Sequence, residues 1–258
     1  MPAILNPGAG QNRFRFSAPD AAPALRPFVT HYWVVTWDLR GRDPYEQQVL
    51  PYPAVNMTFT AGRCRIAGVP RGRFTEVLRD AGRVFGVRFH PGGFRPFLGA
   101  PVSSITDRFL AITDVFGPPG GDLAEAVLAA DDDTAVSIMD AFLGARAPRR
   151  PDRAAELAAA IVVRAAGEPA VTRVDDLARE FGLTTRHLQR LFADYVGVGP
   201  KWVIRRHRLH EAAARAADGS RLDLGALAAD LGYSDQAHLT RDFTSMVGMP
   251  PSQYARAQ

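Results

Sequence analysis

The sequence predicts a two-domain protein, with a mainly-β N-terminal domain that carries trailing helices and an all-α C-terminal domain that contains two helix-turn-helix motifs. Short segments rich in aromatic and β-branched residues, separated by turn residues, occupy residues 31–89. A basic, proline-containing segment follows at residues 144–153, GARAPRRPDR. Beyond it, one helix–turn–helix pattern occurs twice, about fifty residues apart. We therefore place the domains at residues 1–144 and 154–258, joined by a linker at 145–153.

Composition narrows the class of protein. The chain has 258 residues, of which 47% are hydrophobic, enough for two domains with real cores. It has no apolar run of roughly 18 residues, and its first residues lack the charged start and apolar core of a signal peptide, so we expect a cytoplasmic protein without a membrane partner. A single cysteine, Cys64, excludes an internal disulfide and a thiolate-cluster metal site. We expect no metal and no cofactor.

The N-terminal domain is expected to begin with an irregular arm over residues 1–25, which are rich in proline and glycine. Five strands are then expected, at His31–Trp37, Gln47–Leu50, Ala54–Thr60, Cys64–Val69 and Arg83–Phe89. Their short length and the turns between them predict a compact β-barrel or sandwich. Six aromatic residues in this region could line an apolar pocket for a small-molecule effector: Trp33, Trp37, Tyr52, Phe59, Phe85 and Phe89.

Helices are expected to complete this domain. A short helix at Phe94–Leu98 is ended by Pro101, and two longer helices are expected at 122–128 and 134–143. The last of these has an apolar side, which could pack on the strands or against a second copy of the chain. The sequence therefore does not decide whether the oligomeric state is a monomer or a homodimer.

The C-terminal domain is expected to open with a helix from Asp152 to about Ala166, and a Thr-x-x-Asp pattern at Thr172 is expected to start the next. The two motifs follow, joined by a helix from Lys201 to about Ala217. Their second helices are expected to begin near residues 185 and 236, the later one capped by Ser234 or Asp235. Glycine and proline after each of them end the helix.

The second helix of each motif has one apolar and one polar face, as a helix that reads the DNA major groove requires. Leu188 and Phe192 in the first copy correspond to Leu239 and Phe243 in the second. The opposite faces hold the candidate base contacts, since arginine, glutamine and threonine hydrogen-bond base edges and an alanine methyl can meet a thymine methyl. These residues are Arg186, Gln189, Arg190, Gln236, Ala237, Thr240 and Arg241. The net charge of +4 is too small to argue for nucleic acid, but a local basic stripe favours phosphate contacts. The candidates are Thr185, Lys201, Arg205 and Arg206.

Residues from about Asp152 to Tyr254 resemble the DNA-binding domain of the AraC/XylS family of bacterial transcription regulators. The residues that carry the resemblance most closely are Gly232-Tyr233-Ser234, Phe243 and the run from Gly248 to Tyr254, GMPPSQY. The front of the chain resembles the family's regulatory domains loosely, around Arg88–Phe94. The resemblance implies a regulator that binds specific double-stranded DNA, with a cupin-like N-terminal barrel that senses a small effector. It leaves RNA polymerase open as a further partner.

An enzyme or a DNA-repair activity in the N-terminal domain, with an accessory DNA-binding tail, is the alternative. Metal-binding cupins present a His-x-His pair with a nearby glutamate, and this sequence has no such pair. Alkyl-transfer repair would need reactive cysteines beyond Cys64. No Ser-His-Asp or Cys-His spacing predicts nucleophilic catalysis, so we expect that the chain is not an enzyme.

Overall fold

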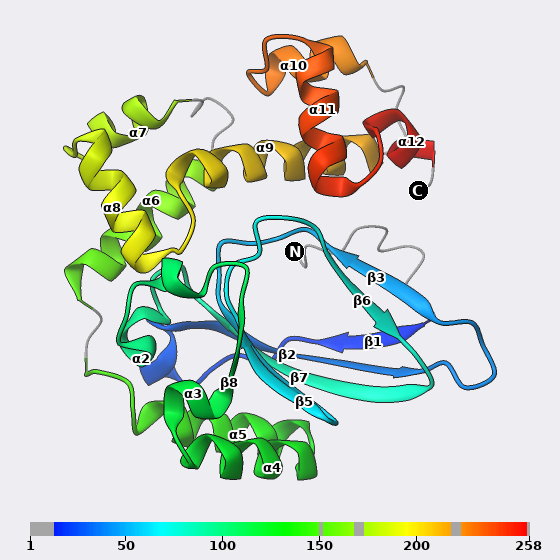
Figure 1. Ribbon diagram of the computed structural model, residues 1–258, viewed down its shortest axis with the longest axis vertical. Helices are drawn as coiled ribbons and strands as arrows, with labels where there is room; N and C mark the ends of the chain where they lie inside the picture. Colours follow the sequence, from blue (N-terminus) through cyan, green and yellow to red (C-terminus); the bar gives the residue numbers. More distant parts are fainter. Residues whose placement is uncertain (1–12, 150–151, 168–172, 218–222, 257–258) are drawn as a thin grey trace.

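The computed structural model describes residues 13–149, 152–167, 173–217 and 223–256. Its N-terminal part contains a six-stranded antiparallel sheet and a separate two-stranded ribbon (Figure 1). In spatial order, the sheet consists of β1 (Phe14–Ser17), β2 (Val29–Asp38), β7 (Ala81–Phe89), β4 (Asn56–Thr60), β5 (Arg63–Ala67) and β8 (Phe109–Ala111). The ribbon consists of β3 (Tyr45–Val49) and β6 (Phe74–Leu78).

All five strands expected from the sequence are present, in a domain that is rich in sheet as predicted. The strands form two separate sheets, and the larger one ends at β1 and β8 instead of closing into a single hydrogen-bonded ring. The irregular arm predicted for residues 1–25 is wrong for Phe14–Ser17, which pairs with β2, while residues 1–12 lie outside the described part of the chain. The sequence missed β1, β6 and β8 because they are short and mix charged or small residues with the apolar ones.

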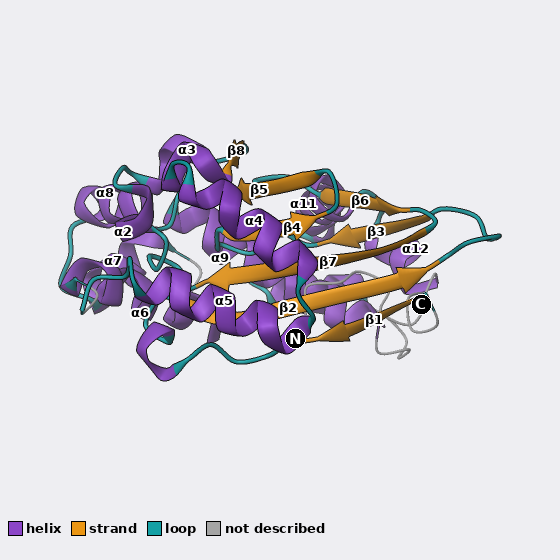
Figure 2. Ribbon diagram, turned by 90° about the horizontal axis from the view of Figure 1, so that it is seen from below, coloured by secondary structure: helices purple, strands orange, loops and turns teal. Residues whose placement is uncertain are grey.

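Two helices cover one face of the larger sheet, α4 (Pro119–Ala129) and α5 (Asp132–Gly144) (Figure 2). Side chains alternate between the faces of a strand, so Phe59 and Phe85 point toward these helices and pack with Met139 in one buried cluster. The helices expected at 122–128 and 134–143 are thereby confirmed. Smaller pieces complete this part: η1 (Pro23–Leu25), α2 (Arg95–Leu98), η2 (Val102–Ile105) and α3 (Ile112–Phe116).

The C-terminal part is helical throughout its described residues. The first motif comprises α6 (Arg153–Gly167), α7 (Val174–Glu180) and α8 (Thr185–Tyr195), and the connecting helix is α9 (Pro200–Ala217). The second motif comprises α10 (Leu224–Asp230), α11 (Gln236–Val247) and α12 (Pro251–Arg256). The second helix of each motif, α8 in the first and α11 in the second, begins near the predicted position, at residues 185 and 236. Arg173 occupies the N-cap of α7, and Thr172, the predicted cap, lies outside the described residues.

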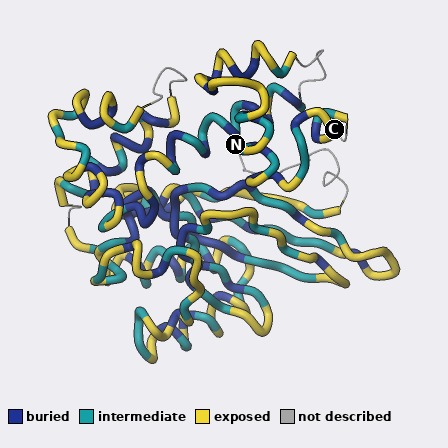
Figure 3. The backbone as a smooth tube through the Cα atoms, turned by 45° about the horizontal axis from the view of Figure 1, so that its top comes forward, coloured by how far each residue is buried: buried dark blue, intermediate teal, exposed yellow. Residues whose placement is uncertain are grey.

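Each motif has its own apolar core, and side chains of the N-terminal domain take part in both cores. Val69, which follows β5, is buried with Leu188 and Phe192 of the first motif. Leu50, which follows β3, is buried with Leu239 and Phe243 of the second. Figure 3 shows the resulting pattern, in which buried and exposed turns alternate along the helices. The N-terminal domain is therefore part of the packing of both motifs.

Candidate nucleic-acid interface

The first motif presents an open polar face on α8. A turn at Gly182, with φ +66°, separates α7 from α8, and the Thr184 side chain caps α8 by accepting a hydrogen bond from the His187 amide at 3.2 Å. Leu188 and Phe192 are fully buried. The opposite side carries three of the predicted base contacts, all exposed and without a hydrogen bond or ion pair to any described residue: Arg186, Gln189 and Arg190.

Thr185 has a structural partner. Its hydroxyl donates a hydrogen bond to the Asp175 carboxylate of α7 at 2.7 Å. This bond fixes the start of α8 against α7. The predicted phosphate contact at Thr185 would thus share its hydroxyl with Asp175, whereas Lys201 at the start of α9 is exposed.

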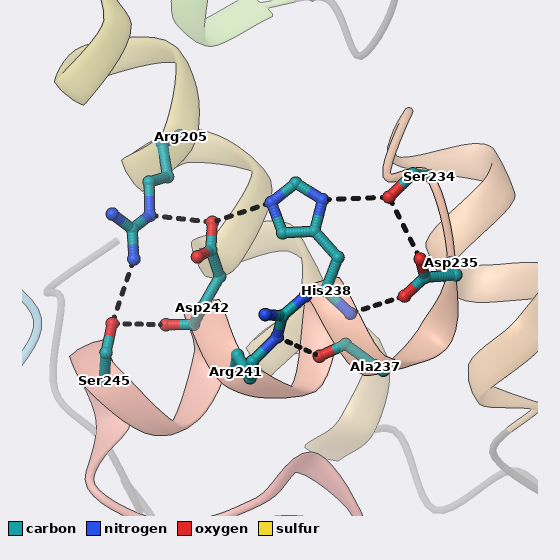
Figure 4. A network of polar contacts seen from close by, with 8 residues as sticks. All are labelled: Arg205, Ser234, Asp235, Ala237, His238, Arg241, Asp242 and Ser245. Carbon is teal, nitrogen blue, oxygen red and sulfur yellow. Dashed lines mark hydrogen bonds and ion pairs between the residues drawn. The ribbon is translucent and has the colours of Figure 1, made fainter.

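The second motif has the same construction, but several of its polar residues have internal partners. Asp235 caps α11 by accepting from the His238 amide at 2.7 Å, which confirms one of the two predicted caps. Gln236, Ala237 and Arg241 are exposed, and Thr240 is partly exposed. The Arg241 guanidinium donates back to the carbonyl oxygen of Ala237 at 3.3 Å, so it lies along its own helix (Figure 4).

A polar network joins α11 to α9 (Figure 4). Arg205 of α9 forms an ion pair with Asp242 at 2.8 Å and donates to the Ser245 hydroxyl at 3.0 Å. His238 Nε2 lies 4.0 Å from the same Asp242 carboxylate, and His238 Nδ1 lies 3.2 Å from the Ser234 hydroxyl. Sequence reasoning missed Asp242 and Ser245, since no local spacing relates them to a residue on another helix. Arg205, predicted as a phosphate contact, holds α11 in place here.

The prediction that Arg206 contacts phosphate is wrong, because its side chain is buried. Its side chain is only 2% exposed and donates a hydrogen bond to the carbonyl oxygen of Pro51 in the N-terminal domain. Burial lowers the pKa of Arg206 to about 10. The reason is helical geometry: Arg206 follows Val203 and precedes Leu209 by three residues each, and both are buried. That spacing was a readable signal that Arg206 belongs to the inner face of α9.

The six aromatic residues predicted to line a pocket do not gather at one place. Phe59, Phe85 and Phe89 are fully buried in the cluster beneath α4 and α5. Trp33 pairs across the sheet with Gly86, one residue from Phe85, so its side chain lies on the other face. A Cβ on Gly86 would lie only 2.0 Å from the Trp33 ring, so this close approach requires glycine. Trp37 likewise lies against Gly82.

A shallow recess without room for a water molecule lies elsewhere, between the N-terminal domain and the end of α8, from Pro53 and His90 to Tyr195 and Val196. None of the six predicted pocket residues lines it. The predicted pocket is thus corrected: strand alternation sends three of its residues into the helix-covered core and two to the opposite face.

Within the described residues, no group of three or more His, Cys, Asp or Glu side chains is placed to hold a metal ion. Across the same residues, every helix is too short or too polar to cross a membrane.

Known proteins match the two parts of the chain separately. Residues 177–257 match the family described as helix-turn-helix domain, and residues 18–111 match a domain of unknown function. The HTH-type transcriptional regulator Rv1931c of Mycobacterium tuberculosis is 34% identical over 85 residues, which is 33% of this chain and 32% of that protein. The chain therefore matches about a third of the length of this curated relative.

Solved structures of regulators are also similar. A probable AraC family transcriptional regulator from Rhodopseudomonas palustris CGA009 is 24% identical, with 38% of this chain and 89% of that chain covered and a TM-score of 0.32. ToxT from Vibrio cholerae O395 is 12% identical, with 95% and 98% covered and a TM-score of 0.40.

Proposed function

We propose that this chain, whose C-terminal part is an AraC-type helix-turn-helix domain, regulates transcription by binding specific double-stranded DNA. The observation that carries the proposal is the pair of outward polar helix faces, on α8 and α11, joined by one continuous helix. That helix, α9, has 18 residues and a length of about 27 Å. One turn of the duplex measures roughly 34 Å, so the two reading helices can enter neighbouring segments of the major groove.

The two helices have different roles in this proposal. The donors of Arg186, Gln189 and Arg190 are not engaged by any described residue, and arginine can bond guanine with two donors at once. On α11, Gln236, Ala237 and Thr240 are the base contacts, with Arg241 held closer to its own helix. Lys201 supplies a phosphate contact, which positions the domain without reading sequence.

The N-terminal domain is the place where a small effector acts in this proposal. Its Val69 and Leu50 belong to the cores of the first and the second motif respectively. A change in the sheet domain is therefore transmitted to both motifs by packing, which supports regulation through that domain. Contact with RNA polymerase and the oligomeric state stay predictions.

The test is selection of bound duplexes from a randomised library by the full-length protein, followed by fluorescence anisotropy at physiological salt. We expect an enriched sequence that binds about 10³-fold more tightly than random duplex. The matched control is Arg79→Ala, an exposed arginine between β6 and β7 of the N-terminal domain, which should leave the preference unchanged. Absence of any enriched sequence, or an enrichment that survives the triple change Arg186→Ala, Gln189→Ala and Arg190→Ala, would contradict the proposal.

A further inference from the structure

The second helix of each motif carries a histidine at the same position, three residues after its cap. His187 donates its amide to Thr184 at the start of α8, and His238 donates its amide to Asp235 at the start of α11. The two rings have different surroundings. The ring of His187 is exposed and has no partner among the described residues, whereas both nitrogens of His238 face a polar group (Figure 4).

The hydrogen bond between His238 and Ser234 can reverse its direction. Nδ1 of His238 lies 3.2 Å from the Ser234 hydroxyl, and Nε2 lies 4.0 Å from the Asp242 carboxylate. A neutral ring with its hydrogen on Nε2 accepts at Nδ1 from Ser234, but a protonated ring donates from both nitrogens. Protonation therefore releases the Ser234 hydroxyl hydrogen, which can then bond to Asp235, whose Oδ2 is 3.2 Å away, or to a group outside the protein.

The charged and titratable groups around His238 already include more cations than anions. They are Tyr233, Asp235, Arg241 and Asp242 around α11, and Arg205 and Arg208 of α9. Burial raises the pKa of Tyr233 to about 12, so this ring is uncharged. Asp242 is paired with Arg205 at 2.8 Å. A proton on His238 thus adds to an existing positive charge, in the first turn of a helix, where a cation is unfavourable and an anion is favourable.

Two of the six histidines are candidates for gaining a proton near pH 7. Burial lowers the pKa of the other four, which are neutral there: His31, His90, His207 and His210. The side chain of His238 is 46% exposed, and His187 is exposed. Imidazole is the side chain whose charge changes between pH 5 and 8, so a pH response of the motifs in that range points to these two rings.

His238 also lies beside the residues of α11 proposed to read bases. It follows Ala237 and is turned from it by about 100° around the helix, toward Arg205 of α9. Leu239 and Phe243 are buried on the opposite side. A helix in the major groove has a phosphate backbone along each side, and the first turn of such a helix commonly contacts phosphate. One backbone would therefore pass along the side that carries His238.

We propose that Ser234 and a protonated His238 bind one DNA phosphate, so that the second motif takes up a proton from solvent as it binds the duplex. The imidazolium supplies a positive charge, and the released Ser234 hydroxyl donates to a phosphate oxygen. The first motif has Leu183 and Leu191 where the second has Ser234 and Asp242, and it binds without this proton. The inference rests on the proposed binding of DNA.

The test measures the association constant of the full-length protein for duplex DNA between pH 8 and pH 5.5, by fluorescence anisotropy at constant ionic strength. It uses the duplex enriched by selection and a random duplex of the same length, because a phosphate contact does not depend on sequence. The complex holds the proton more tightly than the free protein does, so the association constant rises as pH falls. We expect a rise of about tenfold on both duplexes. A flat profile would overturn the proposal.

Two substitutions of histidine form a matched pair. His238→Gln can still hydrogen-bond to Ser234 but cannot gain a charge, so it should bind at every pH as the wild type does at pH 8. His187→Gln should keep the tenfold rise. The salt dependence of binding supplies a readout that a structural role would not change. Its slope should be steeper by about one at pH 5.5 than at pH 8 in the wild type, and equal at both in His238→Gln.

Ser234→Ala tests the hydroxyl separately from the charge. This exposed residue can be replaced without opening a core, and the rise should shrink from about tenfold to about threefold, because one hydrogen bond is lost. A rise that persists in His238→Gln, or that disappears in His187→Gln, would show that the proton is taken up elsewhere. A pH response on both duplexes without any preference between them would contradict the proposed function and leave this phosphate site intact.

Discussion

The two helix-turn-helix motifs share a sequence pattern and differ in what their polar side chains contact. On α8 of the first motif, Arg186 and Gln189 are exposed without partners in the described part of the chain. On α11 of the second, His238 and Arg241 contact neighbouring groups of the same motif. A repeated pattern therefore fixes the shape of a reading helix and leaves open how much of its outer face is free to read. Under the proposed function, the first motif therefore reads bases with more free donors than the second, whose base contacts are Gln236, Ala237 and Thr240.

The motifs also differ in how the N-terminal domain holds them. Besides the buried Val69, polar contacts hold the first: Thr106 donates a hydrogen bond to the carbonyl oxygen of Gly197 at 2.6 Å, and Arg95 forms an ion pair with Asp194 at 2.8 Å. The second is held by the apolar side chains of Leu50 and Val49 and, within its own domain, by Arg205 of α9. Loosening the two motifs therefore requires different changes.

The largest expected effect comes from Leu50→Ala. Leu50 is 3% exposed within the second motif's core, and the change should reduce the free energy of unfolding by about 2–4 kcal/mol. Amide exchange should increase mainly in α10 and α11. The matched variant is Val69→Ala, which should cost about 2 kcal/mol and act mainly on α7 and α8. If both variants increase exchange in the same motif, the separation of the two cores is wrong.

Base reading should distinguish the motifs next. Arg186→Ala should weaken specific binding by about 1–3 kcal/mol and relax the preference at one base position. Arg241→Ala should cost less than about 1 kcal/mol, since its guanidinium already bonds its own helix. Anisotropy on a set of singly substituted operators measures both. Equal losses would remove the asymmetry, and a loss from Arg186→Ala that is uniform over all sequences would make Arg186 a phosphate contact.

Replacing Arg205 should have a smaller effect, and it tests whether this residue stabilises the protein or contacts DNA. Arg205→Ala leaves Asp242, whose side chain is 18% exposed, without its ion-pair partner, and should destabilise the protein by about 1 kcal/mol. A double-mutant cycle with Asp242→Asn measures the coupling by urea unfolding. A phosphate contact at Arg205 would instead reduce the salt dependence of DNA binding while stability stays unchanged. The two outcomes distinguish an internal brace from part of the DNA interface.

The sequence predicted where α8 and α11 begin, near residues 185 and 236, because the signals for a helix start are local. Thr184 and Asp235 cap the helices within the same turn, and Gly248 ends α11 in the left-handed conformation that favours glycine. The same local signals gave five strands of the N-terminal domain. These features depend on residues a few positions apart, although the short strands β1, β6 and β8 were missed.

The predictions that failed depend on contacts between residues that are far apart in the sequence. The predicted basic stripe on α9 gave Arg205 and Arg206 the same role. In the structure, Arg205 faces α11, whereas Arg206 faces the N-terminal domain. The predicted aromatic pocket contained both Trp33 and Phe85, although their side chains lie on opposite faces of the sheet. In both cases the outcome depends on which face of an element meets a distant partner. Composition does not tell which face of an element meets a distant partner. The three-residue spacing from Arg206 to the apolar Val203 and Leu209 was a sequence signal that Arg206 faces inward.

The smallest expected effect concerns the two helix caps. The hydrogen bond from the His238 amide lowers the pKa of Asp235 below its ordinary value of 3.8. Because the folded-state pKa is depressed, the cap contributes stability above the unfolded-state pKa and loses it as pH falls through the folded-state value. Thr184, the cap of the first motif, does not titrate. Acidification from about pH 5 to pH 2 should therefore loosen the first turn of α11 before that of α8.

Amide exchange of residues 236–238 compared with 185–187 measures this difference. Asp235→Asn keeps a capping oxygen and cannot ionise, so it should make the exchange of α11 as insensitive to acid as that of α8. If the two turns loosen together in the wild type, the caps are not what distinguishes them. If the difference persists in Asp235→Asn, another titrating group is responsible, and the Asp242 carboxylate beside His238 would be the group to neutralise next.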